Sequence, residues 1–306
     1  MSKQKRPTWV GPTAKLVERI YGSSSPASVF LTKARTLVHD AKQTKPQIDP
    51  MALAAALNVR VEERKMALDG FLEKDADGTF LVVLSRDAGA QRKRFTLCHE
   101  LAHTFFFDDL ARSRAFRRED EYDPEEERLC NLAAAEMLMP FAMFNRDLLK
   151  LKETDGITPN TIFKLMDRYG VSLQAVSNRV TWILRDSACI LWRSDGNAIN
   201  SQWATPSTMR RIVLCQTGQT SVEKACSSPG RLFSAPDSFY GNDQRLIRRW
   251  TASWQMRSGQ IFSVLTRKQA GRVDCHDTRP NASSSTTPPK EPTRHCEFEQ
   301  QVLAFD

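Results

Sequence analysis

The hydrophobic pattern predicts helices in some stretches of the chain and strands in others. Apolar residues recur at helical spacing over residues 13–43, with a break near Gly22, and again over residues 47–58. Residues 59–63 alternate instead between apolar and polar side chains, and residues 78–85 are rich in β-formers after an Asp-Gly turn. The pattern therefore predicts an α+β fold, with helices and strands in the same domain.

A helix predicted over residues 95–107 carries the clearest chemical signal, because no Gly or Pro interrupts it. His99 and His103 lie one turn apart on it and so share a face. Two imidazoles in this arrangement can bind one zinc ion, and Glu100 beside them can take a proton from water, as in the H-E-x-x-H metallopeptidase helix. The alternative is a chance match on an amphipathic helix, but five histidines in 306 residues make such a match rare.

A catalytic zinc site needs a third protein ligand, and no further histidine follows His103 until His276. A carboxylate is therefore the natural donor, and the acidic run of residues 123–127 leads into a second predicted helix. Glu126 falls within the apolar arc of that helix and Glu127 at its edge, so periodicity does not choose between them. The run also suits a solvated helix N-terminus, where the macrodipole favours acidic side chains.

Two stretches of the chain resemble the ImmA/IrrE family of zinc metallopeptidases. Residues 94–103 read R-F-T-L-C-H-E-L-A-H, and residues 127–140 read E-R-L-C-N-L-A-A-A-E-M-L-M-P. The resemblance covers about residues 45–185. The chain departs from the family at Cys130, where alanine is usual, and at Ala133, where an aromatic residue is common. Both keep a small or apolar residue on the buried face, so they leave the zinc site credible.

This resemblance implies a zincin-like fold and assigns roles to the site residues. In the family the glutamate four residues before the asparagine is the third zinc ligand, and that position is Glu127. His99, His103 and Glu127 would then hold one Zn²⁺ per chain, with Glu100 as general base and proton shuttle. On this assignment, Glu126→Gln should have little effect on zinc binding.

The resemblance also implies what the protein does. Family members act in bacterial stress responses or mobile-element switches by cleaving a helix-turn-helix repressor. We therefore expect a zinc-dependent endopeptidase whose substrate is such a transcriptional repressor. The alternative is a non-proteolytic regulator that retains the zincin fold and binds repressor or DNA. A measurement of metal content, followed by a cleavage assay with Glu100→Ala, would separate the two.

Further residues are candidates for handling the substrate. Tyr122, on the loop leading to Glu127, is a candidate oxyanion donor. A strand beside the catalytic helix could offer its edge to an extended peptide. The residues predicted to form this substrate edge strand are Phe80, Leu81, Val82, Val83, Leu84 and Ser85.

Residues 151–186 read as helix, glycine turn and second helix, a helix-turn-helix-like extension. If this pair read DNA, the reading face would be Gln174, Ser177, Asn178 and Arg179. The second helix is poor in Lys and Arg for phosphate contacts, so packing onto the peptidase domain is favoured over DNA binding.

The remaining boundaries follow from composition and pattern. Short apolar runs separated by Ser, Gly and Pro over residues 187–268 predict a small β-rich C-terminal module. Residues 269–306 are rich in Pro, Ser, Thr and charge, which predicts a disordered tail. An N-terminal helical extension over residues 1–44 and a metallopeptidase domain over residues 45–150 complete the organisation.

Composition narrows the class of protein. The hydrophobic share of 41% is enough for a sizeable core, and no uninterrupted apolar run approaches the length of a membrane span. The basic N-terminus lacks the apolar core of a signal peptide, so we expect a cytoplasmic protein with no membrane association. Seven cysteines without C-x-x-C spacing indicate reduced thiols, with Cys98 and Cys130 as core fillers. The net charge of +8 suits an acidic partner or a solvated surface.

Overall fold

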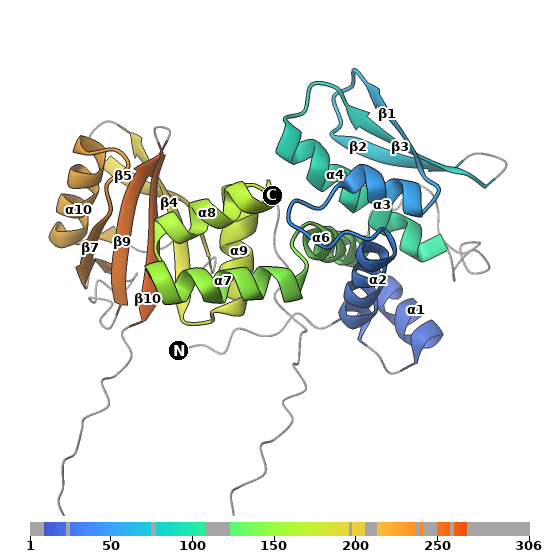
Figure 1. Cartoon of the computed structure of the whole chain (residues 1–306), viewed down its shortest axis with the longest axis horizontal. Coiled ribbons are helices and arrows are strands. Elements are labelled where there is room, and N and C mark those ends of the chain that lie inside the picture. Colours follow the sequence, from blue (N-terminus) through green and yellow to red (C-terminus); the bar gives the residue numbers. More distant parts are fainter. Residues whose placement is uncertain are drawn as a thin grey trace, which may run out of the picture.

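The computed structural model is an α+β fold in which the two larger sheets lie at opposite ends with helices between them (Figure 1). It describes residues 9–22, 25–74, 78–107, 123–195, 198–205, 213–236, 239–240, 250–257 and 260–267. The expected α+β class and β-rich C-terminal module are confirmed. Within those ranges, no helix combines the length and the apolar character that crossing a membrane requires. Tyr122 and the predicted tail over residues 269–306 lie outside the described residues.

The first sheet and the helices around it come from the first half of the chain. In order, the elements are α1 (Pro12–Tyr21), α2 (Pro26–Asp40), α3 (Pro50–Ala56), β1 (Arg60–Arg64), β2 (Gly70–Lys74), β3 (Phe80–Ser85), α4 (Ala90–His103), η1 (Thr104–Phe106) and α6 (Pro124–Leu138). Helices α3 and α6 both start with proline after an aspartate whose carboxylate caps the first turn. Asp49 accepts from the amide of Met51, and Asp123 accepts from that of Glu125.

Strand β3 is the central strand of the first sheet, so the prediction that Phe80–Ser85 form a substrate edge strand is wrong. The strand order is β1-β3-β2, with β1 parallel and β2 antiparallel to β3. Five of the six residues of β3 are buried, as expected for a continuous apolar run with a neighbour on each side. The outer strand that contacts α4 is instead β2, where a Cβ on Gly70 would approach the Thr96 side chain within 2.5 Å.

Helices α7 (Phe141–Asp155), α8 (Pro159–Tyr169) and α9 (Leu173–Ile183) form the middle of the molecule. The predicted helix, glycine turn and second helix are all present. Gly170 takes a positive φ of 61° at the end of α8, a conformation that glycine adopts without strain. Ser172 then caps α9 by accepting from the amide of Ala175.

The second helix of this pair faces the protein interior. Arg179 is only 2% exposed and donates to the fully buried Glu136 and, at 2.8 Å, to the carbonyl of Met139. Glu136 also accepts from the Arg35 guanidinium at 2.7 Å, so it joins α2, α6 and α9. Ser177 is likewise fully buried. Two of the four residues of the hypothetical DNA-reading face are therefore inside the core, which supports the favoured packing role.

The second sheet follows and shares the core of the first part. Its elements and neighbours are β4 (Ser187–Asp195), β5 (Ala198–Thr205), β6 (Val213–Leu214), α10 (Gln216–Ser227), β7 (Phe233–Pro236), β8 (Phe239–Tyr240), β9 (Trp250–Arg257) and β10 (Gln260–Arg267). Five antiparallel strands run in the order β5-β4-β10-β9-β7. Phe262 and Val264 of β10 pack into the large core that includes α4 and α6, while Ile261 and Leu265 face a smaller core with Trp254. This alternation follows from the two-residue period of a strand.

The start of α1 is held against α6 by one buried carboxylate. Glu125 accepts from the amides of Val10 and Gly11, both at 2.9 Å, and from that of Ala14 at 3.3 Å. These amides at the end of a helix have no partners within it, and the helix dipole favours an anion there. A Cβ on Gly11 would lie 2.5 Å from a Glu125 oxygen, so this approach requires glycine.

Candidate metal centre

Helices α4 and α6 pack against each other and bring two histidines and a glutamate together. His99 and His103 lie one turn apart on α4, with their Nε2 atoms 3.2 Å from each other. Glu127 comes from the first turn of α6. Its Oε2 lies 3.2 Å from His99 Nε2, and its Oε1 lies 3.6 Å from His103 Nε2. In the part of the chain that the structure describes, these three residues form the one group that could hold a metal ion.

The spacing of these atoms suits a tetrahedral zinc site. Ligand bonds of about 2.0–2.1 Å at tetrahedral angles separate neighbouring ligand atoms by roughly 3.3–3.4 Å. The three observed separations, 3.2, 3.2 and 3.6 Å, lie around that value. Two imidazoles and one carboxylate also form a donor set that catalytic zinc sites use. His99, His103 and Glu127 therefore fit a zinc ion.

The outer nitrogen of each imidazole has its own partner on α6. His99 Nδ1 lies 2.9 Å from Oδ1 of Asn131, and His103 Nδ1 lies 3.0 Å from Oε1 of Glu126. An oxygen acceptor beside Nδ1 favours the tautomer that carries its proton there and leaves the lone pair on Nε2. The two lone pairs and the Glu127 carboxylate then converge, and a cation between them would relieve their repulsion.

Glu100 follows the first histidine and is buried, with 8% of its surface exposed. Burial raises the pKa of its carboxyl because the charged form loses water, while the nearby rings of His103 and His99 oppose that shift. The Glu127 carboxylate raises the pKa further. A carboxyl whose pKa lies above the ordinary glutamate value is better matched to accepting and returning a proton near neutral pH.

The two cysteines of these helices fill the core, as the sequence predicts. Cys98 and Cys130 are fully buried. Loss of solvent raises the pKa of the Cys98 thiol to about 12, so the thiol stays protonated and unreactive.

The structure brings together the four residues that the sequence singled out, His99, Glu100, His103 and Glu127, on two adjacent helices. Sequence reasoning missed the two partners of the imidazoles. Asn131 lies one turn after Glu127 on α6, a spacing that could have placed it beside one of the imidazoles, and the structure places it beside His99. Glu126 is 6% exposed and contacts His103, so the expectation that this residue has little part in zinc binding does not agree with its position.

We predict that Asn131→Ala and Glu126→Gln each weaken zinc binding by about 10- to 100-fold, the range usual for groups that orient a ligand. Asn131→Ala leaves the His99 ring without its acceptor, and Glu126→Gln replaces a charged acceptor by a neutral one. The measurement is zinc affinity by competition with a chromophoric chelator. Glu153→Gln, at an exposed position on α7, is the matched control. Unchanged affinity in both variants would show that the rings need no such support.

Residues 28–181 match the IrrE N-terminal-like domain family, Peptidase_M78. No curated protein sequence is significantly similar to the chain. Among solved structures, a Mycobacterium tuberculosis transcriptional regulator is similar to this chain with 18% sequence identity and a TM-score of 0.45. The alignment covers 78% of this chain and 75% of that chain.

Proposed function

The chain belongs to the IrrE N-terminal-like domain family, Peptidase_M78, and on that premise we propose that it is a zinc-dependent endopeptidase that cleaves a helix-turn-helix transcriptional repressor. The observation that carries the proposal is the convergence of His99, His103 and Glu127 within ligand spacing, next to the buried carboxylate of Glu100. The family supports a metallopeptidase role. That the substrate is a repressor and that the metal is zinc are both proposed here.

Each residue of the centre has a task in peptide hydrolysis. His99, His103 and Glu127 would hold zinc, which when bound lowers the pKa of a water and polarises the scissile carbonyl. Glu100 accepts the proton of the attacking water and returns it to the leaving amine. Asn131 and Glu126 keep the imidazoles in place while this occurs.

The substrate has to reach this centre in extended form. Strand β2 is an outer strand of its sheet and contacts α4, so its unpaired edge could hold a peptide by backbone hydrogen bonds. A folded helix hides its amide groups in its own hydrogen bonds and cannot pair in this way. The enzyme should therefore cut a segment of the repressor that is exposed or opens transiently.

The test is to co-express the chain with each repressor whose gene is adjacent or co-regulated, with and without stress. Wild type should produce a defined repressor fragment, and Glu100→Gln should leave the same repressor intact. Edman sequencing or mass spectrometry of the fragment then gives the scissile bond. If the repressor stays intact with both proteins while both change promoter output, a non-proteolytic regulator replaces the proposed peptidase.

A further inference from the structure

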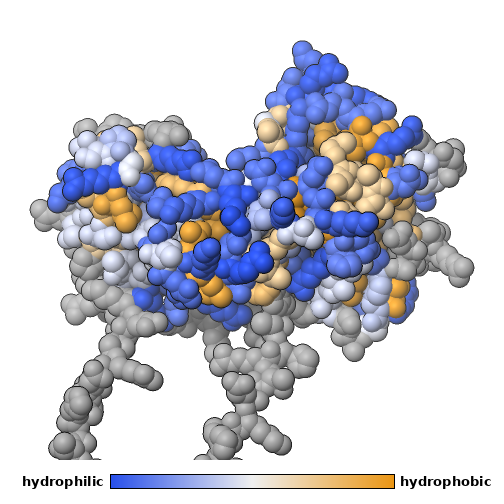
Figure 2. All heavy atoms as spheres, in the orientation of Figure 1, coloured by the Kyte–Doolittle hydropathy of each residue, from blue (hydrophilic) through white to orange (hydrophobic). Residues whose placement is uncertain are grey.

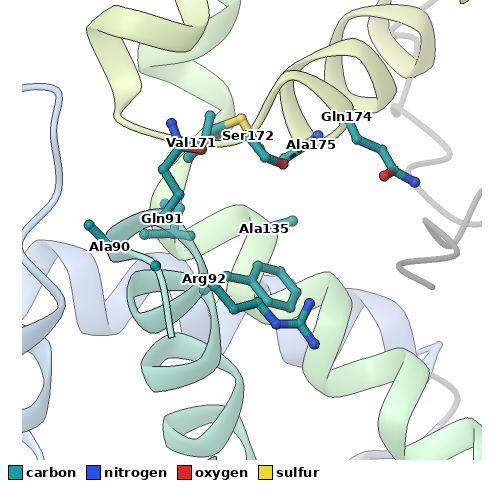
Figure 3. Close-up of a pocket in the computed structure, with 12 residues that line it drawn as sticks. Ala90, Gln91, Arg92, Ala135, Val171, Ser172, Gln174 and Ala175 are labelled. Atoms are coloured by element: carbon teal, nitrogen blue, oxygen red, sulfur yellow. Dashed lines mark hydrogen bonds between the residues drawn. The ribbon is translucent and has the colours of Figure 1, made fainter. Parts of the chain in front are cut away.

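A pocket of about 480 Å³ lies between the start of α4, the end of α6 and the start of α9, outside the group of metal-binding residues. Figure 3 shows Val171, Ser172 and Ala175 on one side of it, facing Gln91 and Ala135 across the opening. In the space-filling view, the surface is hollowed between the two lobes of the molecule in this region (Figure 2). Its volume is within the range of sites that bind small molecules or side chains.

The pocket continues the same helix faces that carry the metal-binding residues. On α4, Phe95 lies one turn before His99 and on its face, and Gln91 lies one turn before Phe95. The rings of Phe95 and His99 have centroids 6.2 Å apart. On α6, Ala135 lies one turn after Asn131, the partner of His99, and on its face. The two helices run antiparallel, so both faces lead from the centre to the same end.

The distance from the centre to the pocket corresponds to a short length of peptide. Phe95 is four residues and Gln91 eight residues from His99, or about 6 to 12 Å along the helix axis. An extended chain advances about 3.3 Å per residue. A peptide with its scissile bond at the centre would therefore place a side chain in this pocket within two to four residues of that bond.

The rim of the pocket is also joined to the strand that we propose holds the peptide. Arg92 lines the pocket and donates to Asp69 at 2.8 and 2.5 Å. Asp69 directly precedes Gly70, the first residue of β2. A chain paired along the edge of β2 thus starts or ends beside this pocket.

The lining indicates which side chain would fit. The walls include buried apolar groups from Leu138, Met139 and Val171, none more than 3% exposed. No carboxylate lines the pocket, and the one charged group, Arg92, is already paired with Asp69. A charged side chain would lose its hydration there without gaining a counter-ion, whereas a large apolar side chain has no favourable hydration to lose. Gln91 and Gln174 at the mouth offer amide groups to the peptide backbone.

We propose that this pocket is a specificity subsite that receives a large apolar side chain of the substrate, such as leucine, methionine or phenylalanine, within two to four residues of the cut. This inference rests on the proposed peptidase function and adds to it a sequence preference. It also gives the start of α9 a role in substrate recognition, because Gln174 and Ala175 form one wall.

Two variants block the pocket in different ways. Gln174→Trp places a large ring at the half-buried mouth, where folding is little affected, and Ala175→Phe fills the wall from within. Lys150→Trp, at an exposed position on α7, is the matched control. Thermal melting of each variant establishes that it is folded before it is assayed.

The first measurement uses a pooled library of unstructured synthetic peptides of 14 residues, with cut sites read by mass spectrometry. Wild type and Lys150→Trp should favour a large apolar residue at one fixed position near the cut. In Gln174→Trp and Ala175→Phe, the ratio of kcat/KM for leucine over alanine at that position should fall about tenfold or more. This ratio cancels any general loss of activity from altered folding.

The second measurement needs no cleavage. Zinc-loaded Glu100→Gln is immobilised, and the peptides that it retains from the same library are compared with those retained by Glu100→Gln combined with Gln174→Trp. Peptides with large apolar residues should be retained by Glu100→Gln and lost when Gln174→Trp is added, and this result supports the subsite. If these peptides are retained but wild type cuts none of them, the peptidase reaction alone is overturned. Cleavage with no apolar preference, or with a preference that both blocked variants keep, overturns the subsite alone. If the protein neither cuts nor retains any peptide of the library, both the subsite and the proposed peptidase function are overturned.

Discussion

Glu100→Gln should keep zinc bound and lower substrate cleavage by about 10²- to 10⁴-fold, the contribution usual for general acid–base catalysis. The amide has nearly the shape of the carboxyl but cannot accept the proton of water. The three candidate ligands are unchanged, so metal content should stay at one zinc per chain. The measurement is single-turnover cleavage of the repressor or of a library peptide, together with metal analysis of the same preparation.

The control for this prediction is Glu153→Gln, which makes the same chemical change at an exposed position on α7. It should cleave at the wild-type rate. Full activity of Glu100→Gln would exclude Glu100 as the base. Loss of zinc from this variant would instead give Glu100 a structural role in the centre.

His99→Ala and Glu127→Gln should each reduce zinc affinity by more than about 100-fold, beyond the range for groups that only orient a ligand. Each variant leaves two of the three protein ligands, and an incomplete set holds the ion poorly. Metal bound to the native state also stabilises it. Added zinc should therefore raise the Tm of the wild type and shift that of either variant much less.

Glu126→Gln is the informative comparison for the ligand assignment, because Glu126 and Glu127 are neighbours on one helix. Its loss of affinity should be smaller than that of Glu127→Gln. The opposite order, with Glu126 essential and Glu127 dispensable, would exchange the two roles. Chelator competition at fixed pH gives both affinities on one scale.

The histidine pair and its base could be predicted from sequence because the geometry is local. One helical turn fixes the relation of His99 to His103, whatever the rest of the chain does. The choice of Glu127 over Glu126 depends instead on how α6 is rotated against α4, which periodicity left open and the resemblance supplied. The contacts of Asn131 and Glu126 with the imidazoles depend on the same rotation, so their roles could be predicted only after Glu127 had been chosen as the ligand.

The position of β3 shows a different limit. An apolar run such as Phe80–Ser85 predicts a buried strand, and the strand is buried. The order of strands in a sheet depends on pairings between distant segments, which a local pattern does not contain. The pocket is similar in this respect, because its walls come from α4, α6 and α9, whose sequences lie up to about eighty residues apart.

Three consecutive glutamates at the start of α6 make contacts in three different directions. Glu125 holds the amides that begin α1, Glu126 supports His103, and Glu127 faces both imidazole Nε2 atoms. Successive residues of a helix are rotated by about 100°, so neighbours cannot exchange these contacts. A deletion or insertion of a single residue between Glu127 and the buried body of α6 would turn all three carboxylates by about 100°, each to the wrong neighbour. This stretch should therefore tolerate some point substitutions in evolution but no change of length.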